Sequence, residues 1–146
     1  MLEVIIACFI SIFVITSYGK FFISLTFSNN YQSNLDISEK GLIGIIVISF
    51  LGLLINFVLP LNEILSSTLF IIGIILGIKY RIYLNKEYLI ITSLISFVLI
   101  IYSNVNRPDA GLYHLPITSI LNESKIIIGL TNIHFRFGHG SLIQYL

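Results

Sequence analysis

The sequence has few charged residues: Asp, Glu, Lys and Arg together make up 10% of its 146 residues. A soluble domain usually carries about 25% of such residues. A water-soluble domain of this size is excluded, because so few charges cannot cover its surface. A bias toward Ile and Asn does not explain why charges are missing from long runs of the chain. The sequence therefore predicts an integral membrane protein.

Tryptophan is absent, and cysteine occurs once, as Cys8. A single cysteine cannot form an intramolecular disulfide, so cysteine usage does not indicate the redox compartment. The net charge of +1 gives no indication of a nucleic-acid partner, and nothing predicts a soluble protein partner. Tyrosines at the ends of apolar runs can anchor helices at the membrane interface in place of tryptophan. These are Tyr18, Tyr80, Tyr83, Tyr88 and Tyr102.

Long apolar runs occupy most of residues 1–105. They cover residues 2–18 (or 2–27, if the first run continues past Lys20), 41–61, 64–80 and 88–105. A spanning helix needs about 20 apolar residues, with a range of roughly 17–25. The runs are continuous rather than alternating, and in lipid only a helix satisfies its whole backbone within one segment. We expect an all-α fold, a polytopic transmembrane bundle of about four spanning helices, with Asp36 or Ser38 capping the second helix.

Lysine and arginine are distributed unevenly between the two sides of this bundle. If the amino terminus faces outward, the short cytoplasmic connections and helix ends hold most of the cations, as the positive-inside rule requires. These are Lys20, Lys40, Lys79, Arg81 and Lys86. Arg107, Lys125 and Arg136 are spread over a longer stretch. Residues 106–146 are therefore expected to form an extracytoplasmic segment of short helices and loops.

This carboxyl-terminal segment concentrates the chemistry-bearing side chains. It contains all three histidines, His114, His134 and His139, together with Asp109. Asp109 can serve as a general base or metal ligand, or it can cap a helix over residues 112–121, which Pro116 would start or kink. The histidine spacing matches no compact zinc motif, so both a divalent cation and ordinary polar loop histidines stay open.

Several stretches of this region resemble a group of bacterial polytopic membrane proteins that are similar to glycosyltransferases of the C superfamily. The stretches are DAGLYHLPI at 109–117, NE at 122–123, GLTNIHFRFG at 129–138 with Ser141 after it, and NFVLPL at 56–61. The likeness extends roughly from Gly41 to the carboxyl end of the chain.

The resemblance implies a lipid-linked substrate and an extracytoplasmic site in the bacterial inner membrane. Enzymes of this superfamily use sugars carried on polyprenyl phosphate, and an acidic residue in an extracytoplasmic loop acts as base or metal ligand. Asp109 matches that position. His114, Asn132, His134 and Arg136 are then candidates for acceptor or pyrophosphate contacts, and the planar fork of an arginine suits phosphate.

The chain also departs from the superfamily pattern. Ala110 follows Asp109 where a second acidic residue is usual, and three additional helices precede the loop. The sequence ends as a new apolar run begins at Ser141, so the expectation is an amino-terminal fragment, inactive on its own. The alternative is a small non-catalytic membrane subunit, a transporter-like or scaffold protein. No charge lies in the centre of a predicted helix, which counts against an ion pathway.

Overall fold

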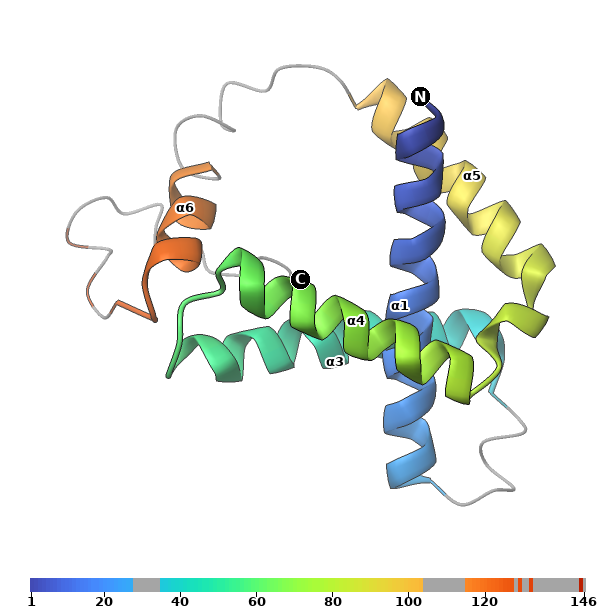
Figure 1. The fold of residues 1–146 in the computed structure, drawn as a ribbon, viewed down its shortest axis with the longest axis horizontal. Helices are drawn as coiled ribbons and strands as arrows, with labels where there is room; N and C mark the ends of the chain where they lie inside the picture. Colours follow the sequence, from blue (N-terminus) through green and yellow to red (C-terminus); the bar gives the residue numbers. More distant parts are fainter. Residues whose placement is uncertain (28–34, 104–114, 128, 130–131, 133–144, 146) are drawn as a thin grey trace. The chain divides into compact units, whose positions relative to one another are not determined.

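The computed structural model describes residues 1–27, 35–103, 115–127, 129, 132 and 145 (Figure 1). Within these ranges the chain forms α-helices and short 3-10 turns, and no strand. The elements are α1 (Leu2–Thr26), α3 (Ile37–Asn56), α4 (Glu63–Lys79), η1 (Ile82–Leu84), α5 (Lys86–Tyr102) and α6 (Leu115–Glu123). The predicted all-α class is confirmed for this part of the chain.

Two of the helices, α1 and α3, are long and apolar enough to cross a membrane by length and composition. They have 25 and 20 residues. α4 and α5 have 17 residues each, which gives about 26 Å at 1.5 Å per residue. That length falls short of a hydrocarbon core of about 30 Å. Of the four predicted spans, α1 and α3 are thus the two helices of clear membrane-crossing length, and α4 and α5 lie at the lower limit of the range of roughly 17–25 residues.

The starts of α3 and α4 follow from local capping. The backbone oxygen of Asp36 accepts the first helical hydrogen bond of α3, from the Lys40 N–H at 3.2 Å. Its own N–H donates to Glu39 Oε2 at 2.7 Å, as in a capping box. Asp36, rather than Ser38, is thus the N-cap. At α4, Asn62 Oδ1 accepts a hydrogen bond from the Leu65 N–H at 3.0 Å.

The chain divides into two compact units that alternate along the sequence. Unit 1 contains Met1–Val47 and Leu69–Asn104, and unit 2 contains Ile48–Thr68 and Val105–Leu146. The division falls inside α3 and inside α4. Each unit is described separately below.

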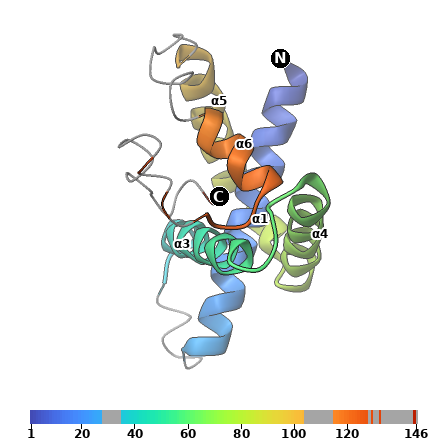
Figure 2. The ribbon, with the colours of Figure 1, turned by 90° about the vertical axis from the view of Figure 1, so that its left-hand side faces the viewer.

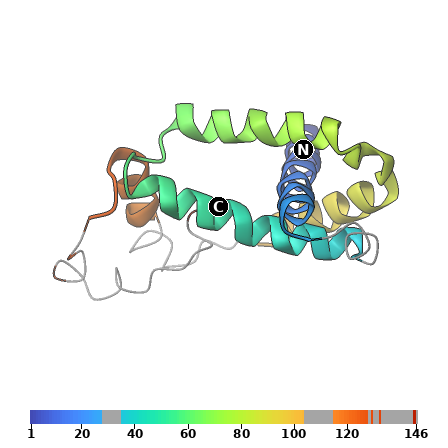
Figure 3. The same ribbon diagram turned by 90° about the horizontal axis from the view of Figure 1, so that it is seen from below.

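In unit 1, α1 lies between α3 and α4 and crosses both, as the end-on view of α1 in Figure 3 shows. Glycines make this crossing possible. A Cβ atom on Gly19 would overlap the carbonyl oxygen of Lys40, and a Cβ on Gly44 would overlap that of Ile15. The backbones of α1 and α3 therefore touch with no side chain between them.

The contact of α1 with α4 also depends on glycines, which here belong to α4. A Cβ on Gly73 would meet Val14 at 2.5 Å and Tyr18 at 2.9 Å. Over this glycine, the Tyr18 hydroxyl reaches the α4 backbone and donates to the Leu69 carbonyl at 2.7 Å. A Cβ on Gly77 would overlap the ring of Phe13. Gly73 and Gly77, spaced four residues apart, thus form a helix-packing surface of α4, and α1 is the helix that packs on it.

In α3 and α4 small residues are buried and large apolar residues are exposed, the inverse of the pattern in a soluble protein. The buried residues of these two helices are glycine, serine or asparagine: Gly41, Gly44, Ser49, Gly52, Asn56, Gly73 and Gly77. Large aliphatic side chains are exposed instead, among them Leu42, Ile46, Leu54, Ile71, Ile75 and Ile78. A soluble core has the opposite arrangement. Small residues at helix contacts and apolar residues outward are typical of helices that pack in lipid.

Gly44→Ala should lower the stability of the folded chain by about 1–3 kcal/mol, the range for an overpacked contact. The physical reason is that the new methyl meets a backbone carbonyl, which cannot rotate away. Gly41→Ala on the same helix is the matched control, because its Cβ meets only the Tyr88 hydroxyl at 2.7 Å, the free end of a side chain. Thermal unfolding in detergent compares the two. Equal melting temperatures would contradict the backbone contact at Gly44.

Candidate functional site

Among the described residues of unit 2, Asn56, the last residue of α3, makes the most side-chain hydrogen bonds. It is fully buried. Its Nδ2 donates to the carbonyl oxygens of Leu59 at 3.3 Å, Leu121 at 3.4 Å and Ser124 at 3.2 Å. An amide nitrogen has two hydrogens, so the three carbonyls share them. One side chain thus joins the end of α3 to Leu121 and Ser124, which follow Asn56 by 65 and 68 positions in the sequence.

Backbone hydrogen bonds complete this junction, which we call the Asn56 clasp. The Asn56 carbonyl accepts from the Ile126 N–H at 2.9 Å, and the Leu61 N–H donates to the Leu121 carbonyl at 2.8 Å. Figure 2 shows α6 lying next to the turn between α3 and α4. The clasp therefore holds three pieces together: the end of α3, that turn, and the carboxyl end of α6 with the residues after it.

The clasp fixes the carboxyl end of α6 against the end of α3. α6 begins at Leu115, with Pro116 in its first turn, where a missing N–H costs no helical hydrogen bond. Ile117 and Leu121 form its buried side. The alternative role of Asp109, as a cap for this helix, concerns a residue outside the described part of the chain.

Two buried polar atoms on the unit 2 part of α3 have no hydrogen-bond partner among the described residues: Ser49 Oγ and Asn56 Oδ1. They lie seven residues apart on one helix face, with Gly52 between them. A Cβ on Gly52 would overlap the carbonyl of Tyr145, so Tyr145 lies directly against this face. Burial raises the pKa of the Tyr145 hydroxyl, which keeps it neutral and able to donate.

Of the site residues predicted from the sequence, only Asn132 is described. It is exposed, and its N–H donates to the Gly129 carbonyl at 2.9 Å. Gly129 has a φ of 92°, which glycine adopts without strain. Asp109, His114, His134 and Arg136 lie outside the described residues, so the structure neither brings these candidates together nor separates them.

No group of three or more metal-ligating side chains occurs among the residues that the structure describes. The three histidines are not among those residues. A divalent cation thus stays a prediction from the sequence.

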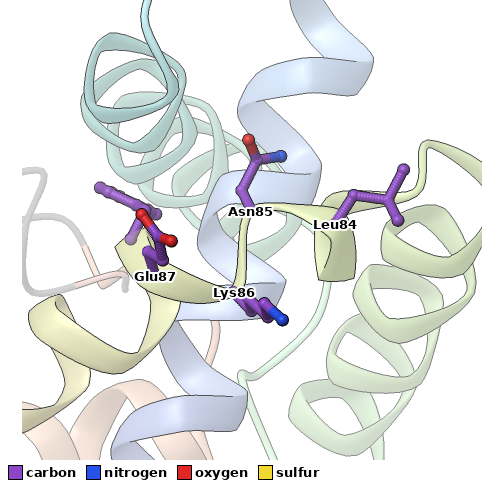
Figure 4. Close-up of a pocket in the computed structure, with 5 residues that line it drawn as sticks. Leu84, Asn85, Lys86 and Glu87 are labelled. Atoms are coloured by element: carbon purple, nitrogen blue, oxygen red, sulfur yellow. The ribbon is translucent and has the colours of Figure 1, made fainter.

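A cavity of about 370 Å³ lies elsewhere, in unit 1, at the start of α5 (Figure 4). Its lining consists of Leu84, Asn85, Lys86, Glu87 and Tyr88. It mixes charged, polar and apolar groups at one helix end, and sequence reasoning did not single it out.

Sequence reasoning also missed the role of Asn56, although Asn56 belongs to a stretch that carries the resemblance. One signal was available: Asn56 is an uncharged polar residue inside the apolar run of residues 41–61. A polar side chain in such a run is costly unless it is hydrogen-bonded. Its partners are distant in sequence and could not be named.

A family model described as a domain of unknown function, DUF8201, matches residues 1–146. The chain belongs to the DUF8201 family. No curated protein and no solved structure matches it. Because the match runs over both units, the Asn56 clasp and the cavity at the start of α5 both fall within the DUF8201 domain.

Asn56→Ala should destabilise unit 2 by about 1–3 kcal/mol, because buried carbonyls lose their donor. The local result should be faster amide hydrogen exchange at Leu61 and Ile126, whose N–H groups are bonded within the clasp. Asn62→Ala is the matched control, since it removes the Leu65 contact alone at the start of α4. Unchanged exchange at Ile126 in Asn56→Ala would contradict the clasp.

Proposed function

We propose that the chain is the membrane-embedded part of a multi-pass protein resembling a polyprenyl-phosphate-sugar-dependent glycosyltransferase, which acts on envelope glycans or lipids. The observation that supports it most is the Asn56 clasp. There, residues 56–61, one of the stretches that carry the resemblance, bond to Leu121, Ser124 and Ile126, which flank the Asn122-Glu123 stretch in sequence. The junction gives a physical reason for an asparagine at position 56.

Membrane integration is the first part of the proposal, and the inverted burial of α3 and α4 supports it. In this proposal α1, α3, α4 and α5 all span the bilayer, which requires α1 to lie more nearly parallel to α3 and α4 than in the crossing that Figure 3 shows. α4 and α5 reach across by thinning the bilayer locally and by extending the side chains of Lys79 and Arg81 to the interface. Two hydroxyls inside the helices suit lipid, because they bond to their own helix. Thr16 donates to the Ile12 carbonyl at 2.8 Å, and Thr92 to that of Tyr88 at 2.6 Å.

The second part of the proposal is the reaction. Asp109 accepts the proton of an acceptor hydroxyl, directly or through a divalent cation, and the acceptor oxygen then bonds to the anomeric carbon of the sugar. The bond between that carbon and the polyprenyl phosphate oxygen breaks, and the phosphate leaves with its electron pair. Arg136 and the polar side chains His114, Asn132 and His134 contact the acceptor or the phosphate, where charge-assisted hydrogen bonds are strongest.

The orientation is tested by cysteine labelling. In a Cys8→Ser background, Ser124→Cys should react with a membrane-impermeant maleimide from the extracytoplasmic side only. Ser38→Cys, near the exposed start of α3, should react only after the membrane is opened, because the cation distribution keeps that end in the cytoplasm. Labelling of both positions from the same side would overturn the topology and, with it, the placement of Asp109.

The reaction is tested by the Asp109→Asn change in a full-length homologue, reconstituted with radiolabelled polyprenyl-phosphate-linked sugars and envelope lipids. Transfer should fall by about 10²–10⁴-fold, the usual contribution of a general base. Asp36→Asn is the matched control, since Asp36 is the only other aspartate and caps α3. Transfer that survives Asp109→Asn would remove Asp109 from the catalytic role.

One observation favours a second candidate, a non-catalytic membrane subunit that serves as a scaffold. Where burial is described, no Asp, Glu, Lys, Arg or His is buried. The helices thus present packing surfaces and no ion pathway. A wild-type protein that transfers no sugar from any polyprenyl-phosphate donor, yet co-purifies with a membrane enzyme, would favour the scaffold.

A further inference from the structure

The connection between α4 and α5 collects positive charge at one end of unit 1. This basic turn, Lys79–Tyr88, contains the exposed cations Lys79, Arg81 and Lys86. Glu87 is its one carboxylate, so the ten residues carry a net charge of three minus one, or +2. The whole chain has a net charge of +1. The rest of the molecule is thus slightly negative, and the positive charge is local.

The basic turn is held in place by α1. Tyr80 is its fixed point: its hydroxyl lies 2.9 Å from Ser24 Oγ, and its ring centroid lies 6.4 Å from that of Phe21. The ammonium of Lys79 lies 5.5 Å from the centroid of the same ring. Arg81 then turns the chain with a left-handed backbone, at φ 54° and ψ 40°. The cations are therefore presented on a rigid support.

Apolar side chains accompany the cations at the tip of the turn. Tyr83 is 51% exposed and Leu84 66% exposed. Leu84 also lines the cavity of about 370 Å³, next to Lys86. Figure 4 shows Lys86 and Glu87 directed to opposite sides of the chain, so the two side chains do not lie against each other. Cations interleaved with exposed aromatic and aliphatic groups are typical of a surface that enters the headgroup layer of a membrane.

We propose that the basic turn binds the headgroups of anionic phospholipids, with Tyr83 and Leu84 entering the interface and Arg81 and Lys86 contacting the phosphates. The proposal rests on the membrane part of the proposed function and not on sugar transfer. Charge complementarity selects an anionic headgroup over a zwitterionic one, and the fork of Arg81 suits phosphate. Free phosphate is a poorer occupant, because it leaves Tyr83 and Leu84 exposed to water.

The absence of tryptophan allows a clean test in the full chain. Tyr83→Trp places one fluorophore at the tip of the turn. The protein is reconstituted in phosphatidylcholine vesicles containing equal mole fractions of brominated phosphatidylglycerol or brominated phosphatidylcholine. Brominated phosphatidylglycerol should quench more strongly at low salt. Adding Arg81→Gln and Lys86→Gln should lower the relative lipid affinity by about fivefold for each charge removed.

Three control variants separate the possible outcomes. Glu87→Gln should strengthen the preference for phosphatidylglycerol, whereas Lys125→Gln, at an exposed lysine of unit 2, should leave it unchanged. Tyr102→Trp, at the opposite end of α5, should show no preference. Equal quenching of Tyr83→Trp by both lipids, or a preference that survives the double glutamine variant, would overturn the lipid site. If Ile95→Trp, in the middle of α5, is quenched by neither lipid, membrane integration itself fails.

Discussion

The backbone contact of α1 with α3 at Gly19 and Gly44 is the constraint on which unit 1 depends. In lipid, apolar side chains gain little by leaving the solvent, so helices associate through close van der Waals contact and hydrogen bonds. Such contact needs a helix surface without side chains, and each glycine supplies one. Once α1 is fixed against α3, its opposite face presents Val14 and Tyr18 to Gly73 of α4. The hydroxyl of Tyr18 can then reach a carbonyl of α4.

In unit 2 the segments are held together by a polar side chain, whereas in unit 1 the helices associate at glycines. Its turn and the residues after α6 have carbonyls that no helix satisfies, and an unpaired buried carbonyl is costly. The side-chain amide of Asn56, at the end of the apolar helix α3, donates hydrogen bonds to these carbonyls. The arrangement links the membrane-length helix α3 to the segment that holds the chemistry-bearing residues.

The sequence predicted the parts of this fold that depend on local physics. Charge depletion and continuous apolar runs predicted an all-α chain, and the polar residues at the start of α3 predicted a cap at Asp36 or Ser38, of which the structure shows Asp36. Hydropathy alone extended the second run to residue 61, yet α3 ends at Asn56, because the Val58 and Leu59 N–H groups both bond to the Ile55 carbonyl. The clasp itself was not predictable, since the carbonyls that Asn56 binds lie 65 and 68 residues away. Sequence spacing carries no signal for such a contact.

Helix α5 links the proposed lipid surface to the proposed reaction. The basic turn lies at its amino end, and Asp109 follows its carboxyl end by seven residues in sequence. Under the four-span topology these two features face opposite leaflets, because α5 crosses between them. Attraction of the basic turn to an anionic cytoplasmic leaflet then opposes inversion of α5, and each cation contributes roughly 1 kcal/mol to that preference. In that proposed topology the charge at the turn, and not the apolar runs, would select the side of the membrane that receives Asp109.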